Sequence, residues 1–228
     1  MKILHVVQGY EPVVGGSEWL VKNLSEQFVA RYQDEVTVFT PAASKPAYFW
    51  RNEGKPLPVG EETINGVMVR RFRLFRGLRL GRMLLAHGAH RFRLPYHDWA
   101  RTIQVGPLIF GLTKAIAHSD ADVVFATAFP FMHMYNAVAG ARRGGLPVVL
   151  LGAIHTADKW GYDRQMMYSA IRQADAYIAH TPFEREHLLE KGINAEKIHV
   201  IGGGVDAAKI GLGNGRLVRE QYGFKDDP

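Results

Sequence analysis

The chain opens with Met1-Lys-Ile-Leu-His-Val-Val-Gln-Gly-Tyr-Glu-Pro-Val-Val-Gly-Gly-Ser-Glu18, and this stretch decides the fold class. The apolar run Ile3–Val7 predicts a strand, which leads into a loop that closes on the pair Gly15-Gly16. An amphipathic helix is predicted over Trp19–Tyr32. Its apolar stripe consists of Trp19, Leu20, Leu24 and Phe28. Many nucleotide-binding α/β domains begin with a strand, a glycine turn and a helix in this order.

The glycine pair has two interpretations. Glycines let a backbone approach a bulky ligand closely, and the free amides of the following helix favour a phosphate. The spacing is not G-x-G-x-x-G, and no G-x-x-x-x-G-K-[ST] occurs, so neither the dinucleotide motif nor the P-loop applies. The same residues also fit a plain tight turn that leads into a helix.

Strands and helices are predicted to alternate along most of the chain. Further strands are predicted at Glu35–Thr40, Val67–Phe72, Asp122–Ala126, Val148–Leu151, Ala176–Ala179 and Ile198–Ile201. Further helices are predicted at Trp99–His118, Phe131–Arg143, Lys159–Gln173 and Pro182–Lys191, the last behind a capping box that begins at Thr181. Several strands are apolar on both faces, which is typical of a covered parallel sheet. The pattern predicts a doubly wound, mainly parallel, Rossmann-like α/β domain.

Three segments interrupt this pattern. Pro41–Gly66 contains four prolines and is predicted to be a long excursion. Gly77–Pro95 fits either a mobile loop or a short basic helix. The triple glycine Gly202–Gly204 predicts a flexible hinge, followed by a polar helix around Leu217–Tyr222.

Composition limits the function classes. The 228 residues carry a formal charge of +6, which favours anionic partners such as phosphates, nucleotides or a membrane surface. There is no cysteine, so disulfides, thiolate metal ligands and a thiol nucleophile are excluded. No metal site is expected, because His87 and His90 lack further ligands at a suitable spacing. We find no signal peptide pattern and no apolar run of about 20 residues, so we expect a cytoplasmic protein.

Between Glu62 and Asp98 there is no acidic residue, while arginines alternate there with large apolar residues. The pattern is typical of a surface that contacts anionic lipid or an acceptor, and Arg76, Arg79 and Arg82 are its candidate residues. It also fits an ordinary solvated face whose arginine stems cover apolar surface. Nucleic acid is not expected as a partner, because no RNA-binding motif accompanies the arginines.

Several segments, taken together, carry a family resemblance. Pro12–Glu18 has the pattern P-x-x-G-G-x-E, Glu35–Thr40 is a second strand, and Ile154-His155-Thr156 ends a later strand. Next come Ala174–Thr181, followed by Phe183-Glu184-Arg185, and then the linker Lys197–Asp206. Together they resemble the N-terminal half of GT-B-fold glycosyltransferases of the large retaining family four.

The chain departs from the family pattern in two respects. Gly202 and Gly203 stand where the family usually has proline and asparagine. The family's second domain, which binds the donor through an arginine/lysine pair and E-x7-E carboxylates, has no counterpart in the chain. The resemblance therefore implies an acceptor-side domain over residues 1–201. Residues 202–228 would be the interdomain linker and the start of a missing C-terminal donor-binding domain, and the chain alone would be inactive.

For the full-length enzyme, the resemblance implies transfer of a sugar, with retention and without metal or cofactor, from a nucleotide-sugar donor. The acceptor would be a glycan, a lipid-linked or a small molecule, in cell-envelope polysaccharide biosynthesis at the inner membrane face. His155 is the candidate catalytic residue, and the resemblance implies that it contacts the donor sugar. Because the chain has ten histidines, His155 could equally be a core or loop residue without a catalytic role. The candidate substrate-binding residues are Gly15, Gly16, Glu18, Thr156 and Thr181. Structural roles at helix N-termini are equally open for Glu18 and Thr181.

Two other function classes compete. A non-catalytic α/β module would bind a nucleotide, a lipid or a protein partner, and a reading frame that continues to an E-x7-E motif would exclude it. A Rossmann oxidoreductase is disfavoured, because G-x-G-x-x-G and an acidic residue after the second strand are both missing.

Overall fold

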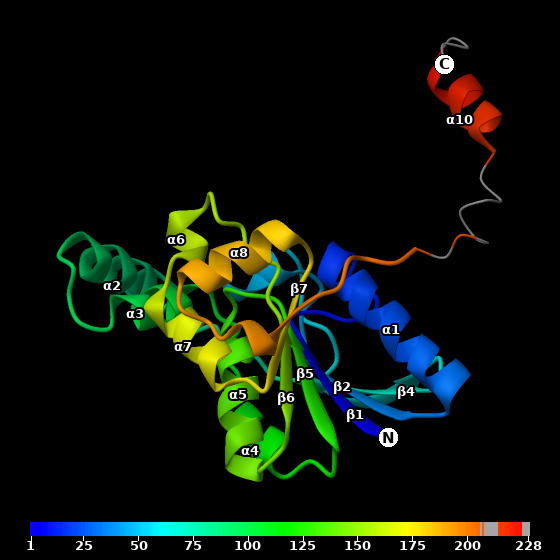
Figure 1. Ribbon diagram of the computed structural model, residues 1–228. Coiled ribbons are helices and arrows are strands. Elements are labelled where there is room, and N and C mark those ends of the chain that lie inside the picture. The colour runs from blue at the N-terminus through cyan, green and yellow to red at the C-terminus, as the bar shows by residue number, and fades with distance from the viewer. Residues whose placement is uncertain (206, 208–213, 225–228) are drawn as a thin grey trace.

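The computed structural model of the protein describes residues 1–205, 207 and 214–224 (Figure 1). Its centre is an eight-stranded sheet with the order β3-β4-β2-β1-β5-β6-β7-β8. The strands are β1 (Lys2–Val7), β2 (Glu35–Pro41), β3 (Gly60–Ile64), β4 (Val67–Phe72), β5 (Val123–Thr127), β6 (Val148–Leu151), β7 (Ala176–Ala179) and β8 (Ile198–Val200). All neighbours pair in parallel except β3 and β4. The predicted mainly parallel α/β fold is confirmed.

Helices cover both faces of the sheet, as Figure 1 shows for α1 on one side and α4, α5 and α7 on the other. The helices are α1 (Gly16–Tyr32), α2 (Arg79–Arg91), α3 (His97–Val105), α4 (Leu112–Ala117), α5 (Met132–Gly144), α6 (Lys159–Tyr162), α7 (Gln165–Gln173), α8 (Pro182–Glu190) and α10 (Gly215–Tyr222). Alternate residues of β1 serve the two cores. Ile3 and Val7 share a cluster with Val21 of α1, whereas Leu4 and Val6 belong to the cluster that contains α4, α5 and α7.

Two predicted helices are wrong in extent. Trp99–His118 forms α3 and α4, because Gly106 has a φ of 75° and Pro107 cannot donate a helical hydrogen bond. Lys159–Gln173 forms α6 and α7, because the backbone at Arg164 is extended, with φ −131° and ψ 124°.

The segment Pro41–Gly66 contains more regular structure than predicted. It includes a 3-10 turn, η1 (Pro46–Phe49), and the strand β3. All residues of β3 except Ile64 are exposed, as suits a polar edge strand, and its sequence therefore lacks the apolar alternation that reveals a strand. The segment Gly77–Pro95 contains the helix α2.

Only part of the predicted apolar stripe of α1 faces the core, since Phe28 packs against the cluster of Ile3, Val7 and Val21 and Trp19 does not. The buried residues of this helix are Glu18, Val21 and Ser25, and Trp19 is 52% exposed. At the other end of the chain, α10 contains the predicted helix Leu217–Tyr222, and residues 214–224 are all exposed. Asp206 of the linker motif lies outside the described residues. Where the structure is described, no helix has both the length and the hydropathy that a bilayer crossing requires.

Candidate functional site

The carboxyl ends of the parallel strands form one edge of the sheet, and the predicted site residues follow these ends. β1 lies between β2 and β5, so the strand order changes direction there. Ligands of open α/β sheets bind in the crevice at such a switch point. The Gly15-Gly16 loop follows β1, the His155 segment follows β6 and Thr181 follows β7. We therefore place the candidate site at this edge.

The loop between β1 and α1 presents backbone rather than side chains. Gly15 is the N-cap of α1 and provides no side-chain cap for the first amides of the helix. A Cβ on Gly16 would meet no atom within 4 Å, whereas a Cβ on Gly15 would collide with the Glu18 carboxylate. Gly16 therefore borders open space, where a ligand has access to the start of α1.

Glu18 lies beneath this loop, with its side chain buried. Burial raises the pKa of its carboxyl, while hydrogen bonds from its own backbone N–H and from Gln8 oppose the shift. The Gln8 side-chain oxygen also accepts a 3.1 Å hydrogen bond from the backbone N–H of Ala128. The contacts from Glu18 through Gln8 to Ala128 join the ends of β1 and β5, and so hold the loop at the switch point.

His155 is exposed in the segment after β6. The centroid of its ring lies 5.1 Å from that of Tyr162, and its backbone C=O accepts a 3.0 Å hydrogen bond from the N–H of Asp158. Thr156 beside it is half-buried. An exposed imidazole on a fixed turn can donate a hydrogen bond to a sugar hydroxyl or accept one from it.

Thr181 is exposed and caps α8, since its hydroxyl oxygen accepts a 3.1 Å hydrogen bond from the N–H of Glu184. Glu184 is not among the site residues predicted from the sequence. Its buried carboxylate accepts three hydrogen bonds, from the Tyr177 hydroxyl at 2.6 Å, from the Ile154 N–H at 3.1 Å and from the His180 N–H at 2.8 Å. Glu184 thus ties the start of the His155 segment to β7 and α8.

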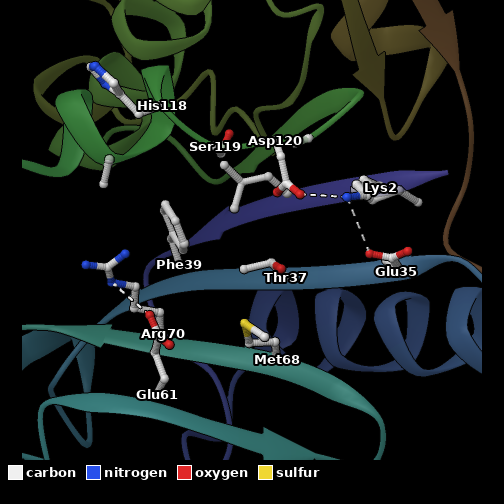
Figure 2. Close-up of a pocket in the computed structure, with 14 residues that line it drawn as sticks. Lys2, Glu35, Thr37, Phe39, Glu61, Met68, Arg70, His118, Ser119 and Asp120 are labelled. Carbon is white, nitrogen blue, oxygen red and sulfur yellow. Dashed lines mark hydrogen bonds and ion pairs between the residues drawn. The ribbon is translucent and has the colours of Figure 1, made fainter.

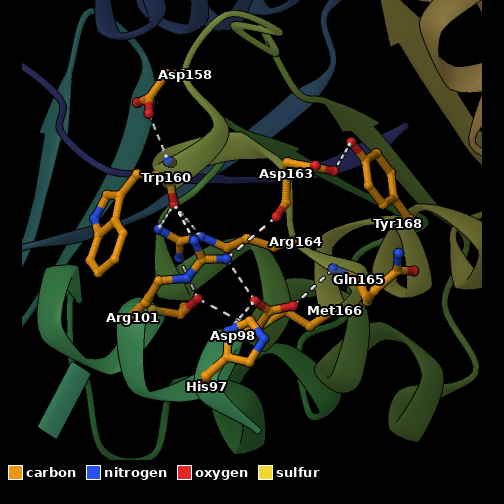
Figure 3. A network of polar contacts seen from close by, with 12 residues as sticks. His97, Asp98, Arg101, Asp158, Trp160, Asp163, Arg164, Gln165, Met166 and Tyr168 are labelled. Atoms are coloured by element: carbon orange, nitrogen blue, oxygen red, sulfur yellow. Dashed lines mark hydrogen bonds and ion pairs between the residues drawn. The ribbon is translucent and has the colours of Figure 1, made fainter. Parts of the chain in front are cut away.

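Two buried arginines hold the far end of the same segment (Figure 3). Arg101 of α3 donates to the backbone C=O of Trp160 at 3.0 Å. Arg164 donates to that same C=O at 3.3 Å and to the Thr102 hydroxyl at 2.6 Å. Burial lowers the pKa of Arg164 to about 10, so it remains charged at neutral pH. The segment that carries His155 is therefore anchored at both ends.

Arg76, Arg79 and Arg82 lie around the start of α2, after the carboxyl end of β4. Arg82 is buried and donates to the backbone C=O of Ile103 at 3.2 Å. Arg76 is half-buried; it donates to the backbone C=O of Tyr48 at 2.9 Å, and its guanidinium carbon lies 3.6 Å from the centroid of that ring. Arg79 is also half-buried. These arginines are therefore built into the fold and do not project freely from it.

His87 and His90 of α2 pack against Trp160. Their ring centroids lie 5.2 and 4.7 Å from that of Trp160. Across the described ranges, no group of three His, Asp or Glu side chains lies close enough together to hold a metal ion. These two histidines instead attach α2 to α6.

A separate hollow of ≈ 270 Å³ lies near the amino ends of β1 and β2 (Figure 2). Its charges pair with one another. Lys2 contacts Asp120 at 2.6 Å and Glu35 at 3.8 Å, and Arg70 contacts Glu61 at 3.5 Å. None of the predicted site residues lines this hollow, so it is not the candidate site.

Comparison with known proteins gives both a family and a fold. A family model described as Glycosyltransferase Family 4 matches residues 14–209. The solved structure of Anabaena HepE in complex with UDP-glucose shares 15% identity and a TM-score of 0.55, over 98% of this chain and 50% of HepE. No curated protein sequence matches the chain.

Two further solved structures have similar scores. The lipopolysaccharide outer core galactosyltransferase WaaB shares 13% identity and a TM-score of 0.51, over 90% of this chain and 46% of WaaB. The UDP-GlcNAc 2-epimerase from Neisseria meningitidis shares 12% identity and a TM-score of 0.52, over 100% of this chain and 54% of the epimerase. The chain thus spans about half the length of these structures, and at such identities the likeness shows the fold alone.

Proposed function

The chain belongs to Glycosyltransferase Family 4, and from this premise we propose that it is the acceptor-side part of an enzyme that transfers a sugar from a nucleotide-sugar donor. One observation carries the proposal: the glycine-started helix α1 and the exposed His155, on a segment anchored at both ends, follow strand ends on the same sheet edge. Two of the similar structures hold UDP-glucose and UDP-GlcNAc, which supports a nucleotide-sugar as the donor.

Each residue has a role in this proposal. The open space beside Gly16 admits the donor's diphosphate to the N-terminus of α1, whose amides stabilise the charge that develops on the leaving group. His155 binds a hydroxyl of the donor sugar, and Thr156, the next residue of the same segment, also contacts the substrate. Glu18 and Glu184 hold these two segments in place, so that little reorganisation accompanies the reaction.

The proposed reaction proceeds with retention at the anomeric carbon and uses no metal or cofactor, since the nucleotide-sugar is a substrate. The similar structures are about twice as long as this chain, so we assign the nucleotide to the other half of the enzyme. Residues 1–201 would then be the acceptor-side domain and residues 202–228 the start of the connection. As a 228-residue chain, the protein would bind a nucleotide-sugar weakly and transfer nothing.

We also propose that the enzyme works at the cytoplasmic face of a membrane, in polysaccharide biosynthesis, on a glycan, a lipid-linked or a small acceptor. The surface of α2 supports this location. Leu80, Leu84 and Leu85 are exposed there, and Arg91 and Arg93 are exposed at its end. Basic and apolar side chains together favour an anionic lipid surface.

The test uses the full-length protein that contains this chain, incubated with UDP- and GDP-sugars and candidate acceptors. We expect release of the nucleoside diphosphate and a glycoside whose anomeric configuration, read by NMR, is that of the donor. The variant His155→Ala should lose most of this activity, whereas His118→Ala, at an exposed histidine away from the carboxyl edge, should keep it. Nucleotide-sugar binding without transfer for any pair of substrates would instead favour the non-catalytic module.

A further inference from the structure

A groove of ≈ 750 Å³ lies between residues 50–53, α2 and the end of α3, and no role has been assigned to it so far. Its volume is in the range of small-molecule sites. Trp50, Asn52, Arg79, Arg82 and Gln104 are among the residues that line it. Polar and charged groups thus meet an aromatic ring in one hollow.

Arg82 is the unusual member of this set. Its side chain is 7% exposed, and Nη1 donates to the backbone C=O of Ile103 at 3.2 Å. Its Nε and Nη2 have no hydrogen-bond partner among the described residues, and neither has the side-chain oxygen of Gln104. Buried N–H donors of a charged group normally have hydrogen-bond partners, and donors without partners lower the stability of the folded protein. The guanidinium of Arg82 thus brings a buried positive charge with unmet donors to the wall of the groove.

The charges around Arg82 define the ligand. Burial lowers the pKa of Arg82, and the nearby positive charges of Arg79 and Arg76 lower it further. Among the described residues that line the groove, the acid is Glu53, which contacts Arg51 at 3.3 Å. Arg79 bonds only a neutral group there, the Asn52 side-chain oxygen, at 2.7 Å. An anion in the groove would relieve the repulsion among these guanidinium groups.

Trp50 connects the groove to the candidate site. It is half-buried, and its ring centroid lies 6.1 Å from that of Phe131, the N-cap of α5 after β5. Further along the same face of α2, His87 and His90 pack against Trp160, which follows His155 in the chain. α2 therefore connects the groove with the segment that carries His155.

We propose that this groove binds an anionic group of the acceptor. Arg79 and Arg82 hold a phosphate or a carboxylate, and the apolar face of Trp50 supports the acceptor's sugar ring. A guanidinium presents a fork of donors that matches either oxyanion. The assignment of the ligand as the acceptor rests on the proposed function; the binding of the anion does not.

The test follows the indole N–H signals of the four tryptophans by NMR in the 228-residue chain. The probes are glucose 6-phosphate, glucuronate and neutral glucose, at constant ionic strength. We expect the two anions, or one of them, to shift the Trp50 signal saturably and to leave Trp19 of α1 unchanged. Glucose should bind at least tenfold more weakly, because it lacks the charged group. A response to glucose 6-phosphate alone assigns a phosphorylated acceptor, and a response to glucuronate alone assigns a carboxylated one.

Variants make the assignment specific. Arg79→Gln should weaken anion binding at least tenfold, whereas Arg142→Gln, at an exposed position of α5, should leave it unchanged. Because loss of the buried Arg82 can unfold α2, we use Arg82→Lys, which keeps the charge but not the fork, and check its fold by circular dichroism. If it folds, its binding should also be weaker.

Two results would overturn the inference: a Trp50 signal that no probe moves, or an equal loss of binding in Arg79→Gln and Arg142→Gln, which indicates unspecific attraction. The titration needs no donor, so its failure is distinct from failure of the proposed function. Normal anion binding in a full-length enzyme that transfers no sugar would contradict only the proposed function.

Discussion

The Oε1 atom of Glu184 accepts a 3.1 Å hydrogen bond from the backbone N–H of Ile154, thirty residues earlier in the chain. The neighbour of Ile154 is His155, so a buried carboxylate at the start of α8 fixes where an exposed histidine stands. The Tyr177 hydroxyl shares the same oxygen at 2.6 Å, and burial together with the Glu184 charge raises the pKa of Tyr177. The geometry of the open site thus depends on a side chain that does not face it.

Glu184→Ala should lower the free energy of unfolding by about 3 kcal/mol, because it leaves buried donors without an acceptor. Urea unfolding of the 228-residue chain measures this. Tyr177→Phe, which removes one donor, should cost about 1 kcal/mol. Glu186→Ala is the matched control, since Glu186 is exposed on the same helix and its loss should be within about 0.5 kcal/mol. Equal stabilities of Glu184→Ala and Glu186→Ala would show that the carboxylate does not anchor the segment.

The two glycines of the first loop should respond differently to substitution. Gly16→Val should leave the free energy of unfolding within about 0.5 kcal/mol of wild type, because a Cβ there enters open space. In the full-length enzyme the same change should reduce sugar transfer at least tenfold, since the side chain occupies the path to the α1 amides. Gly15→Ala should instead cost about 1–3 kcal/mol of stability through the contact with Glu18. Native turnover in Gly16→Val would remove this loop from the site.

His155→Ala should lower turnover of the full-length enzyme by about one to three orders of magnitude, the scale of a lost preorganised polar contact. Stability should change little, because the side chain is exposed. Steady-state kinetics and thermal unfolding on the same samples separate the two effects. A variant with the wild-type rate would leave His155 as an ordinary loop residue.

Two buried histidines should make the protein less stable in mild acid. Burial lowers the pKa of His5 and of His133 from 6.5 to about 4. Between these values the unfolded chain binds protons that the folded chain does not, so the free energy of unfolding falls as the pH drops from 6.5 to 4. Each histidine should contribute about 3 kcal/mol to this loss, and nothing above pH 6.5.

Urea unfolding at pH 7 and at pH 4.5 measures this dependence. His5 donates to or accepts from the Ser25 hydroxyl at 2.7 Å, and His133 bonds the backbone C=O of Thr127 at 2.7 Å. The variant His133→Gln keeps a polar side chain that does not titrate, so it should show a smaller loss of stability between the two pH values. An unchanged pH dependence in this variant would mean that His133 is not the titrating group.

The chain should sediment with anionic vesicles at low salt and much less with neutral ones. Each surface cation contributes about 1 kcal/mol, and the attraction is screened over about 10 Å at 0.1 M salt. Changing Leu84 to Ser together with Arg91 and Arg93 to Glu should abolish binding. The control changes Arg142 and Arg143, an exposed basic pair on α5, to Glu and should bind normally. Wild-type protein that ignores anionic vesicles would make the surface of α2 an ordinary solvated face.

The strands were predictable because they carry apolar runs, as β6 and β7 do, or apolar residues at alternate positions, as at the start of β4. β4, β6 and β7 have the predicted ends, whereas the exposed edge strand β3 carries no such signal. The breaks at Gly106 and at Arg164 were missed, because apolar spacing continues across them and tertiary contacts decide the backbone. In α1, helical spacing identified an apolar stripe whose Phe28 packs against the core, but not that Glu18, Val21 and Ser25 would be the buried residues.

The site was predictable only where a motif exists. The strand–glycine–helix pattern predicts the glycine loop, and the resemblance alone points to His155; both segments lie at the carboxyl edge, where we place the candidate site. Glu184 appeared in the sequence as the last residue of a capping box and in the family motif Phe183-Glu184-Arg185, but with no role of its own, and Arg101 carried no signal at all. Their partners include backbone N–H and C=O groups many residues away, and a backbone group has no sequence signature.

β1 is the first of the eight strands of this sheet to be synthesised, yet it lies in the middle of the sheet. Lys2 pairs with Glu35, but Ile3 also pairs with Val123. On a translating ribosome, the apolar cluster shared by β1, β2, β4 and α1 can form once residue 72 has emerged. The other edge of β1 pairs with β5, which is complete only after roughly fifty more residues have been synthesised. At about 5–20 residues per second, the nascent chain carries an unpaired, apolar strand edge for several seconds. Slow translation of this middle segment would therefore favour capture by chaperones or aggregation of a chain whose finished domain has no such edge at β1.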